Sequence, residues 1–88
     1  MFKNMEEKLY DAAKDFVKRY GQENVSEHII DIIVSVMRTR DNIGPMGGGF
    51  VQSVVNNDLC GAVIKADNEC LQHIKLIALS RNNCFCEM

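Results

Sequence analysis

The apolar residues of this chain recur at every third or fourth position along most of its length, which is the spacing of one face of an α-helix. In the first such segment the positions between them hold Lys, Asn, Glu and Asp, and Gly21 follows the last of them. Glycine is favoured just past a helix end because it adopts the left-handed conformation easily. We therefore expect an amphipathic helix that ends near Tyr20. Its apolar residues are Phe2, Met5, Leu9, Ala12, Ala13, Phe16 and Tyr20.

The second apolar segment combines helix start signals with a run of β-branched residues. Asn24 can cap a helix while Glu27 reaches back toward it, and Ser26 is an alternative cap. The apolar residues that follow cover much of a helix circumference, which predicts a central, heavily buried helix to about Arg38. β-branched residues also favour strands, but the start signals are helical and no partner strand is evident. The apolar residues are Ile29, Ile30, Ile32, Ile33, Val34, Val36 and Met37.

Residues 39–49 contain the only proline and four of the six glycines, so we expect the longest loop there. Phe50, Val51, Val54 and Val55 then predict a short helix, which the polar cluster at residues 56–58 breaks.

A last helix is expected from Leu59, capped by Asp58, to about Ser80, with a possible break near Asp67-Asn68. A near-heptad spacing marks its inner face, formed by Leu59, Val63, Ala66, Cys70, Ile74 and Ile77. The predicted fold class is all-α: a small bundle of three to four helices with the Gly-rich loop between the second and third. Residues 1–88 are expected to be a single helical domain, with residues 81–88 as a short tail.

Size and charge limit the partners of the chain. An 88-residue chain hides only about two thirds of its extended surface, so its core is thin and we expect a homo-oligomer. The net charge of -2 provides no cationic field, which predicts no binding to a nucleic-acid duplex. No apolar run approaches the roughly 20 residues that span a bilayer, and the start of the chain is amphipathic and acidic. We therefore expect no membrane contact and a cytoplasmic location.

The cysteines are expected to be reduced, with Cys60 and Cys70 as small core residues. Cys70 and His73 share a helical face, and with Cys84 and Cys86 they offer four possible zinc ligands. Their spacing is unusual for a zinc site, so we expect no metal and no cofactor. His28, in a first helical turn, is expected to be solvated.

The most informative candidate site is formed by the glycines Gly47, Gly48 and Gly49. Glycines let ligand atoms approach the backbone, and the N–H groups at the start of a following helix can bind an anion. Arg38 and Arg40 precede the glycines and can donate to a phosphate, while Phe50 can stack on a base. The alternative is that glycine and proline simply reverse the chain between two helices. Both interpretations remain open.

Further candidate ligand-binding residues are Asp41, Asn57 and Asp58. Carboxylates can bind a ribose or a metal, but Asp41, Asp58 and Asp67 also stand where helix caps or turn residues are expected, and capping is favoured. No Lys-Ser or Lys-Thr follows the glycines, as a P-loop requires, and neither histidine belongs to a catalytic motif. The sequence therefore predicts a binding protein that is not an enzyme.

Residues 40–67, RDNIGPMGGGFVQSVVNNDLCGAVIKAD, resemble a pattern in small uncharacterised accessory proteins of tailed bacteriophages. The pattern comprises a Gly-Pro turn, Gly-Gly before Phe, Asn-Asp-Leu, and then Ala-Asp. It is carried here by Gly44, Pro45, Gly48, Gly49, Phe50, Asn57, Asp58, Leu59, Ala66 and Asp67. Other members continue into a Cys-Trp-Gly tail, whereas this chain has Cys84-Phe85-Cys86.

The resemblance implies a phage protein acting in the host cell cytoplasm, where small accessory proteins often block host immunity. With the glycine-rich loop and its arginines, it predicts counter-defence by sequestration of a small phosphate-bearing signal molecule. The alternative is a protein-binding inhibitor of a host defence complex such as a CRISPR effector. A third interpretation is a helper in virion assembly or regulation.

Overall fold

The computed structural model describes residues 5–20, 25–43 and 45–82. Within these residues the chain is helical and contains no strand, which confirms the all-α class and excludes a strand for the β-branched run. The helices are α1 (Met5–Arg19), α2 (Glu27–Arg40), α3 (Gly49–Val55), α4 (Leu59–Lys65), α5 (Asn68–Gln72) and α6 (Ile74–Asn82). The described residues thus form six helices, where the sequence predicts three or four.

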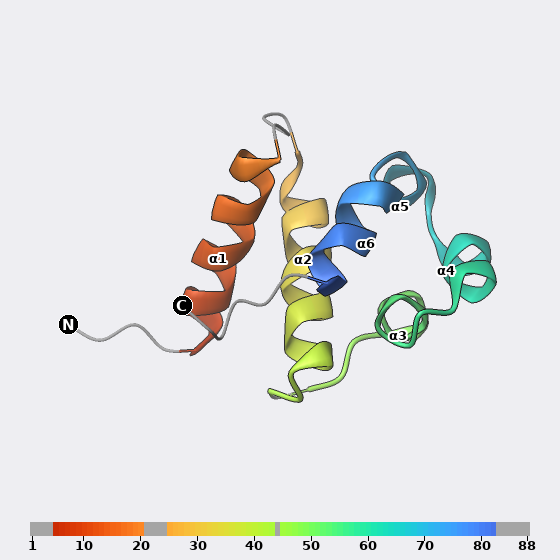
Figure 1. The fold of residues 1–88 in the computed structure, drawn as a ribbon, viewed down its shortest axis with the longest axis horizontal. Helices are drawn as coiled ribbons and strands as arrows, with labels where there is room; N and C mark the ends of the chain where they lie inside the picture. The colour runs from red at the N-terminus through yellow and green to blue at the C-terminus, as the bar shows by residue number, and fades with distance from the viewer. Residues whose placement is uncertain (1–4, 21–24, 44, 83–88) are drawn as a thin grey trace.

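α2 lies at the centre of the fold and packs against α1, α3 and α6 (Figure 1). α1 runs antiparallel beside it, while α3, α4 and α5 lie on the other side of α2. The inward positions of α2 are filled by Ile29, Ile30, Ile33, Val34, Val36 and Met37, all buried. Burial on several sides explains why β-branched residues are accepted here, since packing outweighs their lower helix propensity.

Ser26 is the N-cap of α2: its side-chain oxygen accepts a hydrogen bond from the backbone N–H of Ile29. The other predicted cap, Asn24, lies outside the described residues, as do Phe2 and Gly21. The carboxylate of Glu27 accepts a hydrogen bond from the hydroxyl of Tyr10 on α1. That hydrogen bond fastens the two antiparallel helices together.

α1 ends where the sequence predicts, with Tyr20 in a turn after Arg19. Its apolar stripe buries Leu9, Ala13 and Phe16, as the helical spacing requires. Tyr20 keeps much of its side chain exposed but packs its ring against Phe16, with the ring centroids 4.8 Å apart.

The predicted last helix is divided into α4, α5 and α6. The first break is at Ala66 and Asp67, both with extended backbone, and Asp67 caps α5 by accepting from the N–H of Cys70. The sequence marks this break. The second break, at His73, has no such signal: the His73 N–H donates to the carbonyls of both Glu69 and Cys70, which closes α5 after five residues.

These breaks change which side chains face the core. α6 is turned so that Leu76 and Ile77 are buried, whereas Leu59 and Val63 of the predicted inner face are exposed on α4. The expectation that Cys60 is a core residue is also wrong, because it lies on the exposed part of the same helix. Cys70 is buried, as predicted. A straight helix from Leu59 would have kept Leu59, Val63, Cys70 and Ile77 on one face.

Candidate functional site

Arg40, a predicted phosphate ligand, joins the end of α2 to the end of α6. Its Nε and Nη2 donate to the two carboxylate oxygens of Asp41 at 3.0 and 2.9 Å, a bidentate ion pair. Its Nη1 donates to the carbonyls of Ser80 and Arg81 at 3.3 and 3.0 Å. These carbonyls belong to the last turn of α6, where a cation also meets the negative end of the helix. The geometry gives Arg40 and Asp41 a structural role.

Gly47 is held tightly between α2 and α3. Its N–H donates to Thr39 Oγ1 at 2.9 Å, and its carbonyl accepts from Gln52 Nε2 at 2.8 Å. A Cβ added at Gly47 would lie 2.5 Å from Ser35 Oγ and 2.7 Å from Val51 Cγ1, both closer than such atoms can approach. The glycine is therefore required by packing, which is what the chain-reversal interpretation predicts.

The next residues of the loop differ from Gly47. Gly48 is the N-cap of α3 and has open space where a Cβ would stand, while Gly49 begins the helix beside the aliphatic part of Lys65. Phe50 is half-buried and packs against the core. Arg38 is half-buried in the last turn of α2.

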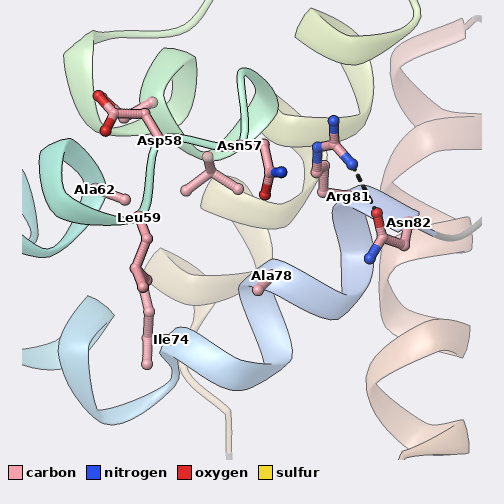
Figure 2. Close-up of a pocket in the computed structure, with 10 residues that line it drawn as sticks. Asn57, Asp58, Leu59, Ala62, Ile74, Ala78, Arg81 and Asn82 are labelled. Atoms are coloured by element: carbon pink, nitrogen blue, oxygen red, sulfur yellow. Dashed lines mark hydrogen bonds between the residues drawn. The ribbon is translucent and has the colours of Figure 1, made fainter.

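A pocket of about 110 Å³ lies between the end of α3, α4 and α6 (Figure 2). It is lined by two of the predicted ligand residues, Asn57 and Asp58, and by Arg81 of α6, which was not among the predicted ligand residues. In Figure 2 Leu59 and Ile74 point toward one another from α4 and from the start of α6. Pockets for drug-sized ligands measure about 300–1,000 Å³, so this one is too small to enclose a nucleotide.

The polar residues around the pocket make hydrogen bonds or turns that stabilise the fold. Asn57 holds a left-handed conformation with φ 62°, which ends α3, and Asp58 caps α4 by accepting from the N–H of Gly61 at 3.1 Å. Arg81 Nε donates to the Val55 carbonyl at 3.0 Å. These contacts position α4 against α3 and α6. Of the predicted ligand residues, Asn57 and Asp58 line this pocket, whereas Arg38, Arg40 and the loop glycines are not among its lining residues.

α4 presents apolar side chains to solvent at the edge of the pocket. Leu59 is 71% exposed, Val63 41% and Ile64 80%, whereas Ala62 is the buried residue of this helix. We call the side chains of Leu59, Val63 and Ile64 the α4 surface. The sequence did hold a signal for it: LCGAVIK is apolar on every side, and a helix of seven residues packed on one side leaves the others uncovered.

The predicted zinc ligands are only partly described. Cys70 is buried; burial raises the pKa of its thiol to about 11, with the neighbouring Asp67 carboxylate adding to the shift. His73 Nδ1 lies 3.1 Å from the carbonyl oxygen of Glu69 in the preceding turn. Cys84 and Cys86 lie outside the described residues. His28 is also not simply solvated, because its Nε2 lies 3.0 Å from a carboxylate oxygen of Asp67.

Comparison of the chain with models of known protein families, with curated proteins and with solved structures found no match. Among the described helices none is both long and apolar enough to cross a bilayer. The candidate site is therefore described from the structure alone: an exposed apolar helix, α4, next to a small pocket that is lined in part by Arg81.

Proposed function

We propose that this chain is a non-enzymatic accessory protein that binds another protein through the α4 surface. The observation that carries the proposal is the exposure of three apolar residues on one two-turn helix: Leu59 is 71% exposed, Val63 41% and Ile64 80%. Fully burying such a side chain is worth about 1.5–3 kcal/mol. Exposed apolar side chains that are grouped on one element of a small domain mark interaction sites more often than isolated ones do.

The surroundings of the α4 surface suit a protein interface. Asp58 stands at the start of α4 and Lys65 at its end, so charged residues flank an apolar centre. Protein interfaces commonly combine a dry apolar centre with a polar rim. The adjoining pocket gives a partner side chain a place to insert, and anchoring residues in such pockets supply much of the affinity in interfaces.

Sequestration of a small phosphate-bearing signal is supported less well. The guanidinium of Arg40 already makes four hydrogen bonds to protein oxygens, and Gly47 is fixed through both its N–H and its carbonyl. A phosphate would have to displace these bonds. The pocket volume also favours a side chain over a nucleotide.

The setting of the proposal comes from the resemblance of residues 40–67 to phage accessory proteins. In that setting the partner is a host defence complex, such as a CRISPR effector, which the chain blocks by covering a working surface. An apolar α4 surface can cover such a surface by binding alone, with no catalytic step. The expected homo-oligomer and the cytoplasmic location remain predictions.

The proposal is tested with Ile64→Glu, which places a charge on the α4 surface at a position that packing does not constrain. Met46→Glu is the matched control, because Met46 is also apolar and 67% exposed but lies in the segment before α3. Each tagged variant is expressed in host cells, checked for helicity by circular dichroism, and purified with whatever protein it retains. We expect Met46→Glu to keep the wild-type partner and Ile64→Glu to lose it, together with protection of phage growth.

Three results would contradict the proposal. A folded Ile64→Glu protein that retains the partner would show that binding occurs elsewhere. A purified wild-type dimer that Ile64→Glu converts to monomers, measured by native mass spectrometry, would assign the α4 surface to a second copy of the chain. Release of a small ultraviolet-absorbing molecule on denaturation would favour sequestration instead.

A further inference from the structure

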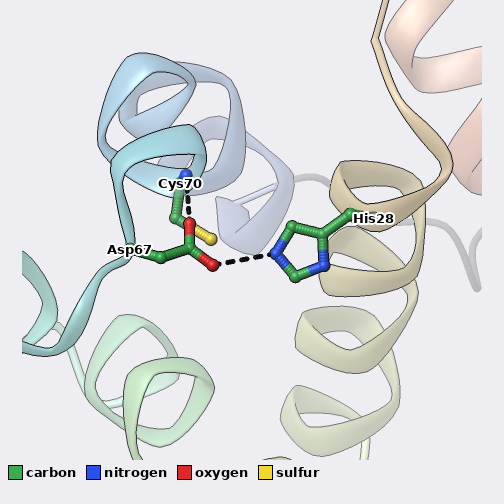
Figure 3. A group of neighbouring side chains, drawn as sticks. All are labelled: His28, Asp67 and Cys70. Carbon is green, nitrogen blue, oxygen red and sulfur yellow. Dashed lines mark hydrogen bonds and ion pairs between the residues drawn. The ribbon is translucent and has the colours of Figure 1, made fainter.

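A second group of side chains lies between the start of α2 and α5, where Figure 3 shows His28, Asp67 and Cys70 facing one another. His28 Nε2 is 3.0 Å from Asp67 Oδ2, and the three possible ligand atoms, including Cys70 Sγ, all lie within 4.8 Å of one another. In Figure 3 the Cys70 sulfur is turned toward the carboxylate and the imidazole. Asp67 and Cys70 stand three residues apart at the start of α5, whereas His28 lies on α2, so the sequence spacing does not predict the group.

Imidazole nitrogen, carboxylate oxygen and thiolate sulfur are the three ligand types that zinc takes in proteins, at about 2.0–2.3 Å from the metal. Ligand atoms around a tetrahedral zinc are consequently about 3–4 Å apart. The group is already within about 1 Å of that arrangement. The side chain of His28 is about half exposed, so its imidazole can rotate by this amount. We propose that His28, Asp67 and Cys70 bind a zinc ion, with the fourth position open to solvent.

The local hydrogen bonds prepare this site. Asp67 Oδ1 accepts from the Cys70 N–H at 2.7 Å, which fixes the carboxylate and leaves Oδ2 directed at His28. Ser26 Oγ donates to Glu69 Oε2 at 2.6 Å, which holds the start of α2 against α5 without any metal. Such supporting contacts orient metal ligands and strengthen binding.

Charge and access also suit a cation. The start of a helix repels a cation weakly, but α5 has only five residues, and the carboxylates of Asp67 and Glu69 add negative charge there. The exposed His28 and Asp67 provide the entry path, while the buried Cys70 closes the inner side. On binding, the thiol proton of Cys70 leaves to solvent and the sulfur forms the bond to zinc.

This site is independent of the α4 surface. A bound ion would join the first turn of α2 to α5 and so restrain the part of the fold that the breaks at Asp67 and His73 loosen. The competing explanation is that Asp67 is a helix cap that pairs with His28, beside a cysteine buried for packing.

The test uses Zn²⁺, and Co²⁺ as its spectroscopic substitute, on a Cys60→Ser, Cys84→Ser, Cys86→Ser protein, so that Cys70 is the remaining thiol. We expect one metal ion per chain, a thiolate-to-cobalt absorption band, and a Tm rise of about 5–10 °C when free Zn²⁺ is tenfold above Kd.

Three single variants decide which residues bind. Asp67→Asn keeps the cap, since Asn caps as well as Asp, yet it should weaken Zn²⁺ binding at least about tenfold. His28→Gln, at an exposed position, should do the same, and Cys70→Ser should abolish the cobalt band. His73→Gln is the control and should bind Zn²⁺ like its parent.

The proposal fails if the triple variant binds no Zn²⁺ or shows no thiolate band. It also fails if folded Asp67→Asn and His28→Gln proteins keep the parent affinity, or if His73→Gln alone removes binding. In each case the three residues form a cap and an ion pair only.

Discussion

The two sides of α2 use similar amino acids in different ways. On one side, α1 and α2, with 15 and 14 residues, bury Phe16, Ile29 and Ile33 with almost no exposure. On the other side α4, with seven residues, buries Ala62 and exposes Ile64. A long helix can turn a continuous stripe toward its neighbour, whereas a two-turn helix with residues apolar on every side cannot hide them all. Composition alone thus does not separate core from binding surface; helix length and the number of neighbours do.

The largest expected effect contrasts two isoleucines. Ile33→Ala removes side-chain contacts from a fully buried position and should lower the free energy of unfolding by about 2–5 kcal/mol. Ile64→Ala removes an exposed side chain and should change it by no more than about 0.5 kcal/mol. Urea denaturation followed by circular dichroism measures both values. Equal losses would mean that Ile64 is covered in solution, by a second copy or by another part of the chain.

Two neighbouring glycines give the next contrast. Gly47→Ala forces a Cβ against Ser35 and Val51 and should cost about 1–3 kcal/mol, whereas Gly48→Ala meets open space and should leave stability nearly unchanged. Thermal unfolding of the two variants tests this. If Gly48→Ala were the more destabilising change, the α2–α3 connection would not pack as described.

A smaller effect is expected at the cap of α4. Asp58→Ala removes the acceptor for the Gly61 N–H and should cost about 1 kcal/mol, while Asp58→Asn should cost little, because both side chains cap helices. Hydrogen exchange of the amides in α4 measures the loss directly. Equal exchange in the two variants would show that α4 is held by packing and not by its cap.

The smallest effect is electrostatic and concerns the hydrogen bond between α1 and α2. The hydrogen bond from the Tyr10 hydroxyl to the Glu27 carboxylate raises the pKa of Tyr10 above 10.0, because ionisation would break the bond and bring two negative charges together. The stabilisation is therefore complete below the ordinary tyrosine pKa and is lost as the pH rises through the raised value.

Ultraviolet titration, with Tyr10→Phe to assign the signal, should show the pKa of Tyr10 falling in Glu27→Gln. An unchanged titration of Tyr10 in that variant would mean that the two helices are not joined by this hydrogen bond in solution.

The sequence predicted those parts of the fold that local physics determines. The periodic stripes of α1 and α2 locate both helices, Ser26 and Asp58 cap helices, and the break at Asp67 follows from its short polar side chain. Each of these features depends on residues within one or two turns of each other.

What the sequence missed depends on distant contacts. No turn residue marks the break at His73. Together with the break at Asp67, it turns α6 relative to α4, so that Leu59 faces solvent while Ile77 is buried. The hydrogen bonds from Arg40 to two carbonyl oxygens of α6 also depend on distant contacts, and no sequence pattern indicates them. The grouping of His28 with Cys70 likewise exists only once α5 lies against α2.

The most direct test of the proposed α4 surface is site-specific photo-cross-linking in phage-infected host cells. A photoreactive residue replaces Ile64 in one protein and, as a control, Lys14 on the exposed face of α1 in another. The account predicts one host polypeptide cross-linked from position 64 and not from position 14. Cross-linking from position 64 to a second copy of the chain alone, or equal capture from both positions, would contradict it.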